Sequence, residues 1–181
     1  DTFIILRFIS WCASHDVGHH GILNKLEFVK ELEKYARVLI TSEGELDAAL
    51  ENNRIKVSPE KLHDLLYYAS LYVGEGGTTT SEAATLGTHS LQISTNTKDC
   101  GVFNKLHDYG LMWMFGDENG VIDLVKELLQ KKDLWKEGKD KRDTLVAESV
   151  NVTDFMVWFI DNYPQSLKEM EKNPNSVGDQ F

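Results

Sequence analysis

The sequence has little cysteine and no long apolar run. Its 2 cysteines, Cys12 and Cys100, lie far apart and in no metal-ligand spacing. We therefore expect free thiols in a reducing compartment, and hence a cytoplasmic protein. No signal peptide is visible, and no apolar stretch approaches the length of a membrane-spanning helix. These absences argue against a disulfide-stapled fold and against a membrane span.

Positive charge is also scarce. The chain carries 19 Lys and Arg against 29 Asp and Glu, a formal net charge of −10, and its pI is about 5.0. Such an acidic chain is a poor candidate for a nucleic-acid or anionic-membrane binder. An anionic ligand would have to be held by backbone dipoles and local groups rather than by a positive field. The oligomeric state is left open by these numbers.

With 181 residues, 41% of them hydrophobic, the chain fits one globular domain with an appendage. Short apolar runs alternate with segments of helical periodicity. The expected strands are residues 3–9, 37–42, 54–57, 71–73, 89–94 and 111–115. The expected helices are 22–36, 43–53, a helix from 58 through 69, 82–87, 103–109 and 121–129. This alternation predicts an α/β fold, a Rossmann-like doubly wound parallel sheet with a C-terminal helical extension.

The predicted organisation has three parts. Residues 1–135 form a Rossmann-like nucleotide-binding domain, 136–172 a charged linker and a C-terminal helix that packs back on it, and 173–181 a disordered tail. The charged stretch is interpreted as a solvated helix end or linker, and Thr153 as the cap of the last helix. Alternatively, the apolar face of that helix packs against a neighbouring domain instead of against the sheet. A chain that opens directly on a buried strand suggests a piece of something longer.

The most informative stretch is 71–87, where an apolar run ends in Gly74, Gly76 and Gly77, then Thr78–Thr80 and Glu82. A strand, a tight glycine turn and a helix N-terminus make an anion site suited to phosphate. The same pattern also makes an ordinary strand-to-helix connection with threonine caps. A carboxylate at Glu82 suits two ribose hydroxyls, or alternatively complements the helix dipole.

Other motifs are weaker. The polar loop 10–21 gathers His15, Asp16, His19 and His20 near Cys12, but no fixed ligand spacing is satisfied, and we expect no metal. The glycines fail the dinucleotide fingerprint and are followed by no Gly-Lys-Ser/Thr, which argues against NAD and against a Walker A loop. We therefore expect no cofactor. Lone His89 and Cys100 are expected to be structural.

The pattern Gly-Gly-Thr-x-x-x-Glu-Ala-Ala-x-Leu-Gly at 76–87 resembles the C-terminal half of GT-B-type nucleotide-sugar enzymes. It is similar to a prokaryotic domain-of-unknown-function family related to UDP-N-acetylglucosamine 2-epimerase and the GT-B glycosyltransferases. The stretches 14–16 and 142–155 also look like that family, so the resemblance covers about 3–160. It implies one half of a GT-B fold, with a nucleotide sugar as ligand.

The resemblance also implies roles for individual residues. Glu82 would hold the ribose, and segment 55–57, with Lys56 at its centre, would border the base through main-chain groups. The diphosphate would be held by Gly76, Gly77, Thr78 and Thr79.

In the resembled epimerase, a histidine in the loop after the first strand belongs to the active site, and His15 matches it by position. The arginine-rich sequence that follows it there is absent, as is the N-terminal half of these enzymes. The chain alone is therefore not expected to catalyse a reaction. Three interpretations stay open: half of a glycosyltransferase, half of a nucleotide-sugar epimerase, and a non-catalytic assembly module.

Overall fold

The computed structural model describes residues 2–96 and 100–173, apart from the side chain of His15. The chain divides into two compact units, Asp1–Asp143 and Thr144–Phe181. The predicted disordered tail falls mostly on 174–181, which lie outside the described residues. Within the described part, no helix is both long and apolar enough to cross a membrane.

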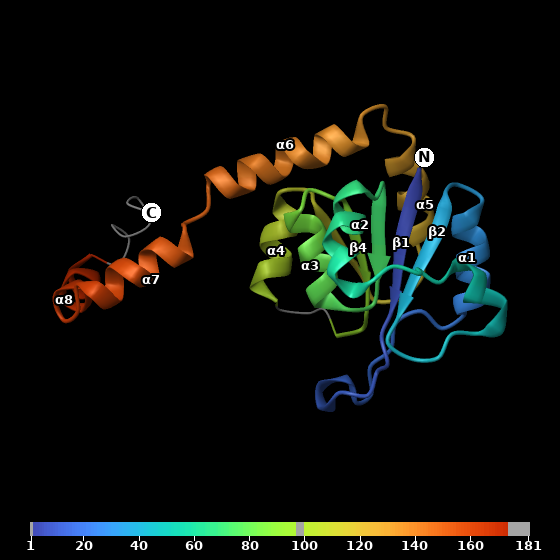
Figure 1. The fold of residues 1–181 in the computed structure, drawn as a ribbon, viewed down its shortest axis with the longest axis horizontal. Helices are drawn as coiled ribbons and strands as arrows, with labels where there is room; N and C mark the ends of the chain where they lie inside the picture. Colours follow the sequence, from blue (N-terminus) through green and yellow to red (C-terminus); the bar gives the residue numbers. More distant parts are fainter. Residues whose placement is uncertain (1, 97–99, 174–181) are drawn as a thin grey trace. The chain divides into compact units, whose positions relative to one another are not determined.

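The first unit is built on a five-stranded parallel sheet (Figure 1). The strands are β1 (Phe3–Phe8), β2 (Arg37–Ser42), β3 (Leu71–Gly74), β4 (Ser90–Ile93) and β5 (Met112–Phe115). Their order is β2-β1-β3-β4-β5, and every neighbouring pair is parallel. The chain reverses its direction of travel across the sheet between β1 and β3, which is where such sheets place their ligands. The predicted Rossmann-like fold class is confirmed.

Helices cover both faces of the sheet. In the first unit they are α1 (Lys25–Glu33), α2 (Leu62–Tyr68), α3 (Gly77–Thr85), α4 (Gly101–Asp108), α5 (Val121–Leu129) and α6 (Leu134–Ala147), whose last residues pass into the second unit. Three 3-10 turns are η1 (Ser14–Asp16), η2 (Ala48–Asn53) and η3 (Pro59–Lys61). Along β1, Ile4 and Leu6 pack with α1 and α5, while Ile5 packs with α2 and α3. Burial on both faces explains why this strand is almost continuously apolar.

Two predicted elements differ from the structure. Residues 54–57 form no strand, only a bridge between Arg54 and Ile40, because η2 ends just before them and η3 begins at Pro59. The helix predicted from Glu82 begins earlier, at Gly77. The hydroxyls expected to cap it lie inside it instead, and Thr80 Oγ1 donates to Gly76 O at 2.8 Å.

The charged segment predicted as a solvated helix end or linker is part of α6. Its Lys139 is only 5% exposed, and its ammonium donates to the carbonyl oxygens of Tyr67 at 3.0 Å and Leu86 at 2.8 Å. It also lies 4.0 Å from the centroid of the Tyr67 ring and 5.0 Å from that of Trp135. Burial lowers the pKa of Lys139 to about 8. This lysine anchors the helix, because partners from three segments compensate its charge.

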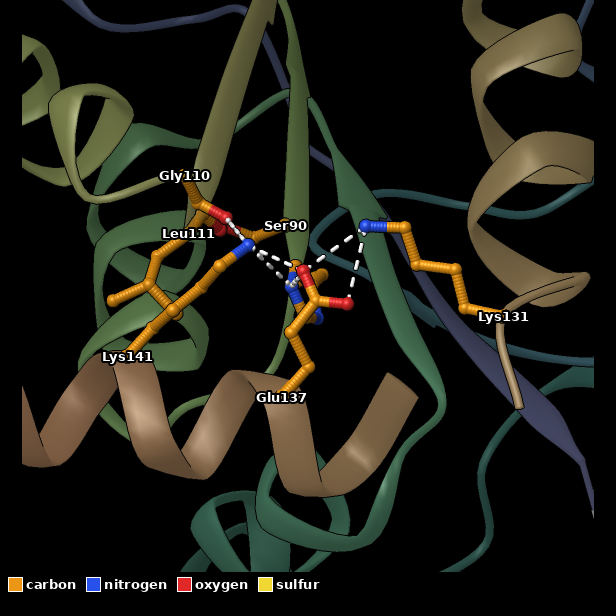
Figure 2. Close-up of polar contacts among 7 residues, drawn as sticks. Ser90, Gly110, Leu111, Lys131, Glu137 and Lys141 are labelled. Atoms are coloured by element: carbon orange, nitrogen blue, oxygen red, sulfur yellow. Dashed lines mark hydrogen bonds and ion pairs between the residues drawn. The ribbon is translucent and has the colours of Figure 1, made fainter. Parts of the chain in front are cut away.

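A second anchor on the same helix is formed by Glu137 and Lys141, two residues before and two residues after Lys139 (Figure 2). Glu137 Oε1 accepts from Lys131 at 3.0 Å and from Lys141 at 2.6 Å, and Lys141 also donates to Gly110 O at 3.0 Å. Hydrogen bonds from Lys141, and secondarily from Lys131, lower the pKa of Glu137 to about 2. Lys131, Glu137 and Lys141 therefore tie α6 to the turn before β5 and to the segment after α5, whereas Lys136, Asp140 and Asp143 keep exposed side chains.

His89 is buried beneath this network, and we therefore expect the first unit to lose stability in acid. Its side chain is 1% exposed, and burial, followed by the charge of Lys141, lowers its pKa to about 4. Folded His89 stays neutral while the unfolded chain takes up a proton near pH 6.5, so stability is lost as pH falls from about 6.5 to about 4. The loss is about 3 kcal/mol. Denaturation midpoints measured against pH should show this slope.

The matched comparison is His89→Gln against His63→Gln, because His63 has a 65% exposed side chain. We expect the slope between pH 6.5 and 4 to flatten in His89→Gln alone. Glu137 acts at lower pH, between its ordinary pKa of 4.5 and its folded pKa of about 2, so the slope from pH 6.5 to about 5 does not come from it. An unchanged slope in His89→Gln would contradict a neutral buried histidine.

The second unit contains α7 (Val152–Asp161) and α8 (Gln165–Lys172). Asn151 caps α7 by accepting from Asp154 N at 3.3 Å, so the cap predicted at Thr153 is wrong. Asn151 precedes the first helical residue, whereas Thr153 already lies within the helix. Ser166 at the start of α8 donates to Phe159 O at 2.7 Å and joins the two helices. The predicted packing of α7 on the sheet domain stays a prediction.

Candidate functional site

A cleft of about 560 Å³ lies at the carboxyl edge of the sheet. Its walls come from the loop after β1, the turn between β3 and α3, the end of β4 and Phe103 of α4. This is the switch point between β1 and β3, where the loops diverge to opposite faces of the sheet. The predicted residues that line it are Gly76, Gly77, Thr78, Thr79 and Glu82.

The turn between β3 and α3 presents an uncapped helix N-terminus to the cleft. Gly76 is the N-cap, and no side chain among the described residues caps the helix. The first amide to bond back within it is that of Thr80, to Gly76 O at 3.3 Å. The amides of Gly77, Thr78 and Thr79 precede that bond, so they carry the positive end of the helix dipole.

Glycine is needed in this turn for close packing. A Cβ at Gly77 would lie 2.5 Å from Cζ of Phe103, and one at Gly76 would lie 3.0 Å from Cγ2 of Ile9. The backbone therefore comes close to both walls. Of the two threonines, Thr78 is exposed and Thr79 is buried. The Thr78 hydroxyl is thus the more accessible to a ligand.

Glu82 lies one helical turn beyond Thr78 and borders two hollows. One is the cleft, and the other is a groove of about 600 Å³ along the outer side of α3, between α2 and α4. The Glu82 carboxylate lies 3.6 Å from Nε2 of His63, and its side chain is 38% exposed. The contact is an ion pair only when His63 is protonated. The carboxylate remains accessible for hydrogen bonds with a ligand.

Glu75, between the glycines, is a site residue that the sequence analysis did not identify. It is 2% exposed, and its two carboxylate oxygens accept from Ile9 N and Ile22 N, each at 2.9 Å. Burial raises its pKa, and these two amide bonds oppose the rise. Glu75 thus joins the two ends of the polar loop that forms one wall of the cleft. The only feature of the sequence that could have pointed to Glu75 is that a charged residue lies between Gly74 and Gly76.

The charges at the cleft wall are mostly satisfied within the protein. Arg7 is the only cation among the described residues that line the cleft, and its guanidinium donates to Glu43 Oε1 at 2.8 Å and to Thr41 Oγ1 at 3.3 Å. The Asp16 carboxylate accepts from Ala13 N at 3.2 Å. Of the acidic side chains here, Glu82 is the one least engaged by backbone amides or by an arginine or lysine.

Two predicted site residues are not brought into this arrangement. His15 belongs to η1, but its side chain lies outside what the structure describes. Lys56 is exposed and does not line the cleft. Its neighbours Ile55 and Val57 line a smaller pocket of about 230 Å³ that shares Arg7 with the cleft. The roles of His15 and Lys56 stay predictions.

The histidine loop is hydrogen-bonded to Thr95, just beyond the end of β4. His20 N donates to Thr95 Oγ1 at 3.0 Å, and His19 Nδ1 lies 3.1 Å from the same hydroxyl. No group of three or more His, Cys, Asp and Glu side chains in the described ranges could hold a metal ion. The geometry thus offers backbone donors and one accessible carboxylate as its chemistry.

The fold and cleft define the class as a Rossmann-like α/β domain. No protein-family model matches the chain, and no curated protein matches it. The chain is similar to the wall teichoic acid polymerase TagF (TM-score 0.49, 15% identity, 99% of this chain and 45% of that chain). It is also similar to a glycotransferase of kitacinnamycin (TM-score 0.45, 13% identity, 78% of this chain and 39% of that chain).

The chain spans less than half the length of either similar structure. Both identities and both TM-scores are low. The fold assignment therefore rests on the strand order and parallel pairing, and the choice of function has to be argued from the cleft.

Proposed function

We propose that the chain is the nucleotide-binding half of a GT-B-like glycosyltransferase. The observation that carries the proposal is the convergence of Gly76–Thr79 and Glu82 on one cleft at the switch point of the sheet. The helix N-terminus suits an anion, and the carboxylate one turn later suits hydroxyls. Their order along α3 matches a diphosphate followed by a ribose, as the motif resemblance implies.

The diphosphate would lie against the first amides of α3. A phosphate needs donors, and the amides of Gly77, Thr78 and Thr79 precede the first bond inside the helix. The Thr78 hydroxyl adds a further donor. During glycosyl transfer the same donors would stabilise the charge that grows on the departing diphosphate. The chain's negative net charge makes such local donors the main source of binding.

The ribose would lie at Glu82, where the cleft meets the groove outside α3. Both hollows share Gly77, Thr78, Glu82 and Phe103. On this proposal a nucleotide extends from the cleft along this shared edge into the groove. Because the carboxylate accepts hydrogen bonds, it pairs with hydroxyl groups and disfavours a second phosphate at this position.

The acceptor and part of the catalytic equipment would come from an N-terminal Rossmann-like half. The chain covers 45% or less of the similar structures, and the motif resemblance implies two halves closing on one nucleotide sugar. On this proposal the chain alone binds the nucleotide part of the donor and transfers no sugar. Half of a two-domain site should bind at about millimolar Kd, or about 4 kcal/mol.

Calorimetric titration of the chain with UDP tests the proposal, with inorganic pyrophosphate as a second ligand. We expect UDP to bind saturably, and Glu82→Ala to weaken it about tenfold by removing the hydrogen bonds to the ribose. Pyrophosphate binding should be unchanged in the same variant, because it uses the amides and the Thr78 hydroxyl at the N-terminus of α3 and not Glu82.

The matched control is Glu127→Ala, an exposed glutamate on α5, which should bind UDP like the wild-type chain. Equal UDP affinity in Glu82→Ala and in the control would contradict the role of Glu82. Absence of binding by both UDP and pyrophosphate would contradict the proposed function for this chain.

A further inference from the structure

Gln92 occupies an unusual position for an amide. It lies in β4, all four residues of which are buried, and its own side chain is 4% exposed. Its neighbours Leu91 and Ile93 pack in the core on the α1 and α5 side, so alternation along the strand directs Gln92 to the α3 side. An internal parallel strand normally carries apolar residues on both faces. A glutamine here needs an explanation other than packing.

The amide oxygen of Gln92 is unsatisfied within the protein. Among the described residues, Oε1 is buried and has no hydrogen-bond partner. Buried acceptors without partners are uncommon because they lose their bonds to water without replacement. Gln92 also lines the cleft. Oε1 itself has almost no exposed surface, and Nε2 is the amide atom nearer Gly77, so a ligand in the cleft supplies the missing partner once the Gln92 amide turns its oxygen toward it.

Gln92 lies directly beside the start of α3. Its Nε2 would be 3.3 Å from a Cβ placed on Gly77, and Phe103 Cζ would be 2.5 Å from that same Cβ. Because Gly77 has no side chain, the Gln92 amide and the Phe103 ring can both approach the N-terminus of α3. A group bound at the amides of Gly77 and Thr78 is thus a neighbour of Gln92.

The first amides of α3 and the amide oxygen of Gln92 have opposite hydrogen-bonding roles. The helix amides donate and suit a phosphate, whereas a carboxamide oxygen accepts and needs a donor. With the amide oxygen turned toward the ligand, the group next to the phosphate would carry a hydroxyl or an N–H. We propose that Gln92 is a specificity-determining residue, whose Oε1 accepts a hydrogen bond from a hydroxyl of the sugar attached to the diphosphate. This assignment rests on the proposed function and adds the sugar subsite to it.

A structural alternative can be separated from this one. Tyr72 OH is also buried without a hydrogen-bond partner among the described residues. Tyr72 packs on the same side of the sheet, with Ala83 of α3. A buried water joining Tyr72 OH to Gln92 Oε1 would satisfy both atoms and would make Gln92 part of the core. Removing the amide would then destabilise the fold and leave ligand preference unchanged.

The test is Gln92→Met, a substitution of similar shape without the amide, compared with Gln130→Met at the exposed end of α5. The measurements are affinities for UDP and UDP-N-acetylglucosamine, and the denaturation midpoint. We expect the wild-type chain to bind the sugar nucleotide about three- to tenfold more tightly than UDP. In Gln92→Met that preference should disappear, with UDP affinity and the midpoint unchanged or higher. Gln130→Met should behave as wild type.

Each other outcome has a definite meaning. A sugar preference retained in Gln92→Met, with or without a lower midpoint, overturns the assignment; a lower midpoint then supports the water-bridged core. No sugar preference in the wild-type chain also overturns it, while UDP binding that still depends on Glu82 leaves the proposed function intact. Absence of UDP and pyrophosphate binding removes the proposed function and this assignment together.

Discussion

Replacing Gly138 with alanine is expected to destabilise the first unit by about 2–3 kcal/mol. Gly138 lies in α6, and a Cβ there would overlap the carbonyl oxygen of Gly87 and come within 3.2 Å of His89 Cε1. Gly87 has φ +78°, so its backbone is a left-handed turn that cannot readily move. The helix would have to shift, and the buried ammonium of Lys139 would lose its carbonyl partners. Denaturant titration of the two proteins measures the difference.

Alanine is otherwise favoured over glycine in a helix by about 1 kcal/mol, so the sign of the effect is informative. Gly101→Ala is the matched control, since Gly101 begins α4 and a Cβ there meets nothing within 4 Å. We expect that control to be neutral or stabilising. A stabilised Gly138→Ala protein would show that α6 does not depend on close approach to Gly87.

Replacing Glu75 with leucine has the second large expected effect, a loss of about 2–5 kcal/mol. The substitution leaves Ile9 N and Ile22 N without their acceptors, at 2.9 Å in the wild-type chain. Glu75→Gln keeps one acceptor oxygen and turns an NH₂ group toward the other amide, so an intermediate loss is expected. Hydrogen exchange at the amides of Ile9 and Ile22 should accelerate in the same order, together with the decrease in denaturation midpoint.

The order of stability of Glu75→Gln and Glu75→Leu separates the effect of lost hydrogen bonds from the effect of lost charge. Because burial raises the pKa of Glu75, removing its charge offers some compensation in both variants. Were Glu75→Gln and Glu75→Leu both as stable as the wild-type chain, with protected amides at Ile9 and Ile22, the carboxylate would not be what closes the loop.

The sequence predicted those parts of the fold in which one strong local signal coincides with the tertiary structure. The strand Arg37–Ser42 and the helix Val121–Leu129 have the predicted bounds, because an apolar run and an amphipathic period each continue to a clear break. Segment 54–57 failed because its apolar residues line a pocket beside η3 rather than join the sheet. Such a distinction depends on neighbours that a local pattern does not contain.

The candidate site divides in the same way. Gly76, Gly77 and Glu82, which line the cleft, could be proposed as candidates because glycines and an acid at fixed spacing have local meanings. Glu75 and Gln92 could not, since their importance comes from Ile9, Ile22 and the cleft, all brought near by folding. Burial of Lys139 likewise depends on distant groups, the carbonyls of Tyr67 and Leu86. A charged residue in a charged segment gives no sign of such partners.

The most direct test of the account is amide NMR of the ¹⁵N-labelled chain during titration with UDP, with uridine as the comparison. The central claim is that the first amides of α3 bind the diphosphate. It predicts that the largest shifts with UDP occur at Gly76–Thr79 and that uridine, which lacks phosphates, moves these amides far less. Saturating shifts confined to other parts of the chain, or equal shifts with both ligands at Gly76–Thr79, would contradict it.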